Sequence, residues 1–170
     1  MMGQQPWQFE FGLIPSTTLT RHWALDDHSR RVREADREGL WNGTSFPSLV
    51  AGLDRMGLDS HMVGASLVRW GEGDENFIDV LVEAGRVCEV KVMLDLRVHC
   101  LKFISDFTLA ANRHQWLVIT TEGMVFRPTV RRCIVEIEES AAMRWVRGSM
   151  NVVVRRKLGD SRISPSTICE

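Results

Sequence analysis

The chain lacks the marks of several protein classes. None of its apolar runs approaches the roughly 18 residues needed to span a bilayer, and the N-terminal MMGQQPWQFEF has no basic segment leading into an apolar one. It contains no C-x-x-C, H-x-x-x-H or H-E-x-x-H pattern for a metal, and no G-x-S-x-G, G-x-x-x-x-G-K-[ST] or G-x-G-x-x-G pattern for a nucleophile or a phosphate. We therefore expect a cytoplasmic protein without a metal or a cofactor.

Closely spaced cysteines are also missing. The four cysteines lie far apart, at Cys88, Cys100, Cys133 and Cys169, and three of them fall in apolar periodic segments. This placement is typical of buried free thiols rather than of disulfides or a zinc site. We expect Cys88 and Cys133 to be buried and unreactive in the native protein.

Tyrosine is absent, whereas tryptophan occurs six times. Four tryptophans lie in or beside periodic apolar segments and are expected in the core: Trp7, Trp41, Trp70 and Trp116. Trp23 and Trp145 are the better candidates for exposed anchors in a contact with another molecule.

What remains is an ordinary globular composition. A length of 170 residues, with 44% hydrophobic and 25% charged residues, suits one folded domain. We expect a single α+β domain over residues 1–157 and a polar C-terminal tail over 158–170. The formal net charge of −1 argues against a protein that coats nucleic acid.

Hydrophobic periodicity predicts elements in the order β, α, β, β, β, α, β, α. Alternating residues predict strands at 6–14, 65–71, 77–97 (a hairpin) and 115–123, and helical spacing predicts helices at 44–57, 98–114 and 128–146. Residues 26–39 are predicted to form a solvated loop or a polar helix, and 151–156 a further short strand. This order favours an α+β fold, a mainly antiparallel sheet with helices packed on one face.

The hairpin at 77–97, FIDVLVEAGRVCEVKVMLDLR, has a register that residue parity constrains. A three-residue loop, Glu83-Ala84-Gly85, puts Gly85 where a left-handed residue is needed and leaves the apolar residues on one side. The predicted partners are Val82 with Arg86, Val80 with Cys88 and Ile78 with Val90.

The other side of this hairpin mixes apolar and charged residues. We expect it to bind a partner through Phe77, Asp79, Leu81, Glu89, Lys91 and Met93. Asp79 directly opposite Glu89 also leaves open a small enzyme or ligand-binding domain that uses these acids. At the end of the same strand, Asp95 and Arg97 share a face and are predicted to form a structural ion pair.

Charge is unevenly distributed along the chain. Residues 71–95 are rich in acids: Glu72, Asp74, Glu75, Asp79, Glu83, Glu89 and Asp95. The C-terminal half is rich in arginine, which leaves open a nucleic-acid binder that would gather Arg131, Arg132, Arg144, Arg147, Arg155 and Arg156 on one stripe. An acidic face would instead suit a basic protein partner.

Several motifs together resemble a widespread family of small, uncharacterised bacterial proteins. The resemblance covers residues 40–147 and rests on Trp70-Gly71, Ile78-Asp79-Val80 and Asp95-Leu96-Arg97. Members of that family look like the immunity proteins found beside secreted toxins, so the resemblance implies a non-enzymatic protein whose partner is a cognate toxin. We expect a cytoplasmic immunity protein that binds neither membrane nor nucleic acid.

Overall fold

The computed structural model describes residues 5–18, 30–31, 40–41, 45–71 and 75–149. The strands of this part are β1 (Gln8–Pro15), β2 (Arg30–Arg31), β3 (Ser60–Met62), β4 (Leu67–Trp70), β5 (Phe77–Glu83), β6 (Arg86–Asp95), β7 (Trp116–Thr120) and β8 (Met124–Phe126). The helices are α1 (Phe46–Leu53), α2 (Leu101–Arg113), α3 (Val130–Glu139) and a last one at 141–149, with 3-10 turns η1 (Ser16–Thr18) and η3 (Asp54–Met56).

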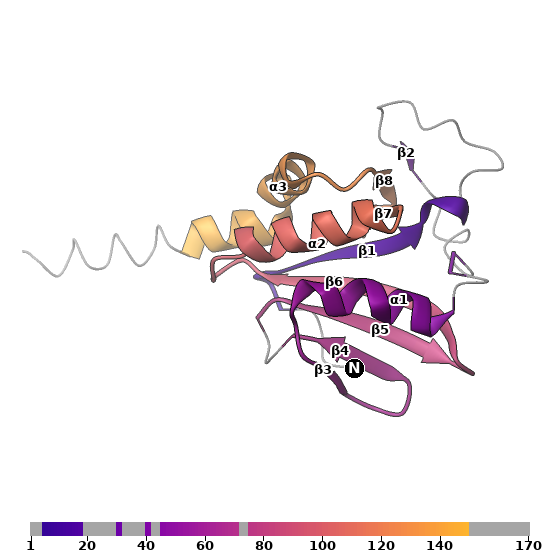
Figure 1. The fold of residues 1–170 in the computed structure, drawn as a ribbon. Helices are drawn as coiled ribbons and strands as arrows, with labels where there is room; N and C mark the ends of the chain where they lie inside the picture. The colour runs from indigo at the N-terminus through magenta and orange to yellow at the C-terminus, as the bar shows by residue number, and fades with distance from the viewer. Residues whose placement is uncertain (1–4, 19–29, 32–39, 42–44, 72–74, 150–170) are drawn as a thin grey trace, which may run out of the picture.

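The strands form one sheet in the order β2-β8-β7-β1-β6-β5-β4-β3, and every neighbouring pair is antiparallel. Helices α1 and α2 lie against one face of it (Figure 1).

The predicted α+β class is confirmed. The short strands β2, β3 and β8 have no counterpart in the prediction, β2 falling in the expected polar segment 26–39. The expected strand at 151–156, the tail at 158–170, Trp23 and Cys169 lie outside the described residues.

The main core lies between this sheet face and the helices. Alternate strand residues and one stripe of each helix supply it, including Phe11, Val80, Val90, Val92, Val118, Leu49, Ile104, Phe107 and Ile137. Trp41, Trp70 and Trp116 are buried, as expected, whereas Trp7 is only half-buried. A smaller cluster on the opposite face joins Ile14, Leu117, Ile119 and Val125, because neighbouring strand residues point to opposite sides.

The loop of the β5–β6 hairpin differs from the prediction. Glu83 pairs with Arg86, so the loop consists of two residues, Ala84 and Gly85, rather than three. Both loop residues have positive φ, 49° and 74°, as in the tight turns whose twist matches that of the flanking strands. The predicted three-residue loop is therefore wrong.

The pairing along the hairpin changes accordingly. In place of the predicted register, Val82 lies opposite Val87, Val80 opposite Val90, Ile78 opposite Val92, Asp79 opposite Lys91, Leu81 opposite Glu89 and Phe77 opposite Met93.

A β-bulge reconciles the two-residue loop with a one-sided core. The ladder shifts between Leu81 and Val82, and Cys88 is left without a partner on β5. This one extra residue resets the alternation, so that Val87 and Val90 both reach the core. Cys88 is exposed, and the prediction that it is buried is wrong because the bulge, not the alternation, sets its direction.

The predicted helix at 128–146 is divided at Ser140. This residue has extended backbone, with ψ 157°, and its hydroxyl donates to the Ile137 carbonyl at 2.6 Å and accepts from the Met143 N–H at 3.1 Å. Ser140 thus ends α3 and caps the next helix. The change of direction leaves Trp145 exposed and buries Val146 instead.

We predict opposite effects from two substitutions in the hairpin loop. Gly85→Val should lower the free energy of unfolding by about 1 kcal/mol or more, because a β-branched residue is strained at positive φ. Ala84→Asn should raise it by up to about 1 kcal/mol, because asparagine tolerates this conformation better than alanine. Urea denaturation of both variants tests this, and a stabilising Gly85→Val would contradict the two-residue loop.

Thiol reactivity should separate the cysteines. Cys133 is buried, and burial raises its pKa to about 12, with the Glu136 carboxylate adding to the effect. A maleimide should therefore label Cys88 in native buffer but Cys133 only after unfolding. Mass spectrometry of the cysteine-bearing peptides measures both, and rapid native labelling of Cys133 would be inconsistent with this core.

Candidate protein-binding surfaces

The six residues predicted to bind a partner do lie together on the sheet face opposite the helices. We call this set, Phe77, Asp79, Leu81, Glu89, Lys91 and Met93, the outer face. Their accessibility differs. Glu89 is exposed and Leu81 is half-buried, but Phe77 and Met93 keep only 5% and 9% of their surface exposed. These two side chains pack within the protein and offer little surface to a partner.

Most charges of the outer face are paired within the protein. The Nε and Nη2 atoms of Arg69 donate to the Asp79 carboxylate at 2.7 and 2.8 Å. The guanidinium carbon of Arg69 also lies 3.6 Å from the centre of the Phe77 ring. Lys91 contacts Glu89 at 3.3 Å and Glu10 at 3.8 Å. This arrangement neutralises much of the acidic surplus.

The expected opposition of Asp79 and Glu89 is wrong. Because the bulge shifts the register, Asp79 lies opposite Lys91, and Glu89 lies opposite Leu81. A like-charge pair across the hairpin, which would have raised the pKa of one carboxyl, is not formed by these two residues.

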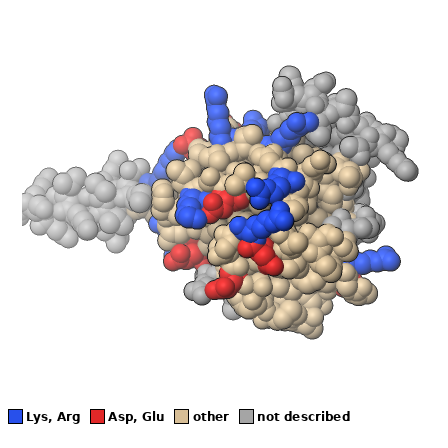
Figure 2. All heavy atoms as spheres, viewed as in Figure 1, with Lys and Arg blue, Asp and Glu red and all other residues tan. Residues whose placement is uncertain are grey.

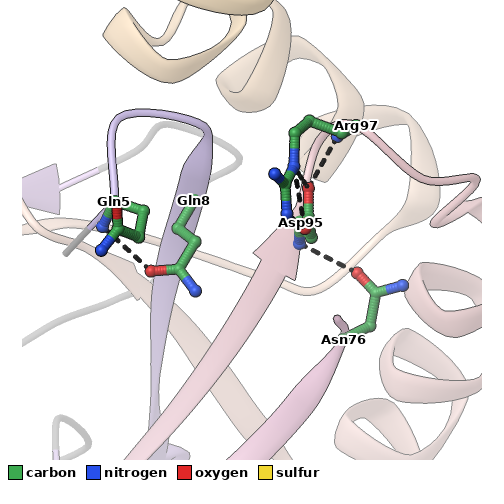
Figure 3. A network of polar contacts seen from close by, with 5 residues as sticks. All are labelled: Gln5, Gln8, Asn76, Asp95 and Arg97. Atoms are coloured by element: carbon green, nitrogen blue, oxygen red, sulfur yellow. Dashed lines mark hydrogen bonds and ion pairs between the residues drawn. The ribbon is translucent and has the colours of Figure 1, made fainter. Parts of the chain in front are cut away.

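A second polar group lies at the end of β6 (Figure 3). Asp95 is 1% exposed, and its carboxylate accepts from the Arg97 backbone N–H at 2.8 Å, from Nε at 3.0 Å and from Nη2 at 2.6 Å. The Asp95 N–H donates to the Asn76 side chain at 3.2 Å. The hydrogen bonds from the Arg97 side chain lower the pKa of Asp95, against the opposing effect of burial, and the same bonds raise the pKa of Arg97.

Arg97 extends this group into an aromatic stack on the surface. Its guanidinium lies 4.0 Å from the Trp7 ring centre, and Trp7 lies 5.4 Å from Trp145 at an interplanar angle of 45°. Trp145 is 42% exposed, and the Arg97 side chain is 50% exposed. We call Trp7, Arg97 and Trp145 the tryptophan–arginine stack.

The sequence marked Trp145 as a candidate exposed anchor and Arg97 as half of a structural ion pair, but it assigned Trp7 to the core. Trp7 precedes β1 rather than lying in it, so strand alternation does not bury its ring. The three residues lie far apart in the sequence, and no local pattern marks their contact. Only the folded structure shows that an exposed tryptophan, Trp145, lies close to an arginine that a buried carboxylate holds in place.

The remaining motif residues fix the entry to β5. Trp70 is buried and its indole N–H donates to the Asp54 carboxylate at 2.9 Å. Gly71 has φ 112°, and a Cβ there would lie 2.8 Å from the Asn76 carbonyl oxygen, so only glycine fits. Both residues therefore have structural roles.

No protein-family model, curated protein or solved structure matches the chain. The family resemblance thus stays a prediction. Within the described residues, no three His, Cys, Asp or Glu side chains are grouped so as to hold a metal ion. None of the helices in the described part of the chain combines the length and the apolar character that crossing a bilayer requires.

We predict that the buried and the exposed carboxylates respond differently to neutralisation. Asp95→Asn should lower the free energy of unfolding by about 1–3 kcal/mol, because it weakens bonds to the Arg97 backbone and side chain in a buried place. Asp106→Asn is the matched control. Asp106 contacts Lys102 at 2.5 Å on the surface of α2, and its loss should cost less than about 0.5 kcal/mol.

The stabilisation that Asp95 provides should also depend on pH. Because the pKa of Asp95 is lowered in the folded state, its stabilisation is fully present above the unfolded-state pKa of roughly 4 and is lost as the pH falls through the folded-state pKa. The stability gap between the native protein and Asp95→Asn should therefore narrow below about pH 4. Urea titrations at neutral and acidic pH measure it, and a gap that widened in acid would contradict the assignment.

Proposed function

We propose that this protein is a non-enzymatic, cytoplasmic interaction protein, an immunity protein that neutralises a bacterial toxin by binding it through the tryptophan–arginine stack. The observation that carries the proposal is that exposed Trp145 lies 5.4 Å from the Trp7 ring, which the Arg97 guanidinium also contacts at 4.0 Å. Tryptophan and arginine are the residues most enriched where binding energy concentrates in protein interfaces. The toxin as partner comes from the family resemblance.

The stack is also held in place before any partner arrives. Arg97 is fixed by three donors, its backbone N–H, Nε and Nη2, which all bond to the buried Asp95 carboxylate. Trp7 is contacted by the Arg97 guanidinium, 4.0 Å from its ring centre, and by Trp145, whose ring centre lies 5.4 Å away. A partner therefore loses little side-chain entropy in ordering these groups, and that favours affinity.

Charges beside Trp145 suggest the chemistry of the partner. Arg144 and Arg147 are exposed on the same helix, Arg144 donating to the Glu139 carbonyl and Arg147 lying 3.7 Å from Glu138. A partner surface with carboxylates around an apolar pocket would complement this helix and would associate faster through electrostatic steering.

The outer face is the second candidate surface for the same function. Its most exposed side chains are those of Glu89 and Lys91, with half-buried Leu81 beside them, and the Glu89 carboxylate would suit a basic toxin. Phe77 and Met93 would support this surface from beneath rather than anchor a partner, because they are buried. Asp79 is committed to Arg69, so its reversal to lysine would cost stability as well as affinity.

Two other functions remain as alternatives. A small enzyme using the hairpin acids would need Asp79 and Glu89 to converge, and both are engaged by cations. A nucleic-acid binder would need free arginines on one stripe. Arg132 contacts Glu136 at 2.5 Å, and Arg147 lies near Glu138, so each is partly neutralised on its own helix or beside it.

We predict that Trp145→Ala weakens binding to the purified product of the neighbouring toxin gene by about tenfold or more, mainly through faster dissociation. Met62→Ala is the matched control, because Met62 is a comparably exposed apolar side chain on β3, and it should leave affinity unchanged. Glu89→Lys tests the outer face. Surface plasmon resonance measures all three.

The outcomes separate the two surfaces. Loss of affinity in Trp145→Ala alone supports the stack, whereas loss in Glu89→Lys alone would move the binding site to the outer face. Full affinity in both variants, with native circular dichroism, would refute both versions.

A further inference from the structure

A hollow of about 300 Å³ lies on the helix-bearing side of the molecule, between α1 with η3 and α2. Its polar lining comes from Arg55, Lys102, Asp106, Arg113 and His114. Figure 2, viewed onto α1 and α2, shows basic side chains gathered over this part of the surface. The hollow is separate from the outer face, since it lies on the other side of the sheet.

The charges in the hollow do not balance. Lys102 and Asp106 pair with each other at 2.5 Å and cancel. Arg55 and Arg113 are exposed, and no hydrogen bond or ion pair joins either guanidinium to another described residue. Two guanidinium groups thus face one hollow without a carboxylate of their own, and guanidinium forks match the geometry of phosphate and carboxylate oxygens.

His114 adds an unsatisfied buried nitrogen. It follows α2, and its ring stacks on Trp116 with centres 5.0 Å apart. Its Nε2 has no accessible surface and no hydrogen-bond partner, a state that is rare and costly for a buried polar atom. Nε2 lies against Gly52 of α1, where a Cβ would come within 3.1 Å of it.

The histidine also responds to the positive charge of the hollow. Burial lowers its pKa, and the nearby Arg55 and Arg113 lower it further. The ring is therefore neutral at pH 7, and a bound anion would oppose the effect of both arginines. Lys102 and Asp106 also border the hollow. Because they pair with each other, the two arginines contribute most of the positive electrostatic potential there.

We propose that this hollow binds the oxyanion group, phosphate or carboxylate, of a small ligand between Arg55 and Arg113, beside the His114 ring. The volume lies at the lower end of small-molecule sites, so a compact ligand fits best. This site is independent of the proposed toxin-binding function, since it uses none of the same residues.

Proton NMR of the His114 ring tests the proposal on the full chain. Inorganic phosphate and acetate are titrated at constant ionic strength, with chloride as the compensating anion. A saturable shift and a raised His114 pKa are expected. The Arg55→Gln/Arg113→Gln variant should bind about tenfold more weakly or worse, whereas Arg131→Gln, which removes an exposed charge on α3, should bind normally.

The two probes also identify the source of the oxyanion. Saturation by phosphate but not acetate supports a phosphorylated ligand, and saturation by acetate supports a carboxylate. A linear response to both anions, or a saturable one that survives in the double variant with native circular dichroism, would overturn the site. No partner protein is present, so failure here leaves the toxin-binding proposal untouched.

Discussion

The β-bulge at Cys88 is the constraint on which most of the structure depends. The two-residue loop Ala84-Gly85 alone would send alternate residues of β6 to the wrong faces of the sheet. One unpaired residue corrects the phase, so that Val90, Val92 and Leu94 lie under the helices. The same phase directs Asp95 to the place where it meets Arg97. The central hairpin, the core and the surface stack therefore share one geometric origin.

The burial pattern could be predicted from the sequence more securely than the pairing. Val90 and Val92 alternate with Glu89 and Lys91 whether the hairpin has a three-residue loop or a two-residue loop with a bulge. Both solutions place Val90 and Val92 in the core, so the α+β class and the membership of the outer face could be inferred. They differ near the loop, where the bulge buries Val87 and exposes Cys88, and where Ala84 adopts positive φ although it is not glycine.

The other differences have local physical causes. The helical spacing of the apolar residues continues past Ser140, so the sequence does not show that its hydroxyl caps the following helix. The strands β3 and β8 have three residues each, too few for an alternation to stand out. The stack could not be predicted at all, because Trp7, Arg97 and Trp145 meet only through tertiary structure. The pair Asp95 and Arg97, two residues apart, could be.

The residues that carry the family resemblance are engaged inside the protein. Trp70 donates to Asp54, Asp79 holds Arg69, and Asp95 holds Arg97. Trp70, Asp79 and Asp95 are also largely buried, so these three side chains have little left to offer a partner.

Similarity through such motifs therefore implies a shared framework rather than a shared partner. Specificity must then come from residues outside the motifs. Trp145 is such a residue, because it is exposed, belongs to none of the three motifs and lies directly on the Trp7 ring that the framework holds against Arg97. The framework would fix the position of the stack, and the last helix would determine which partner it accepts.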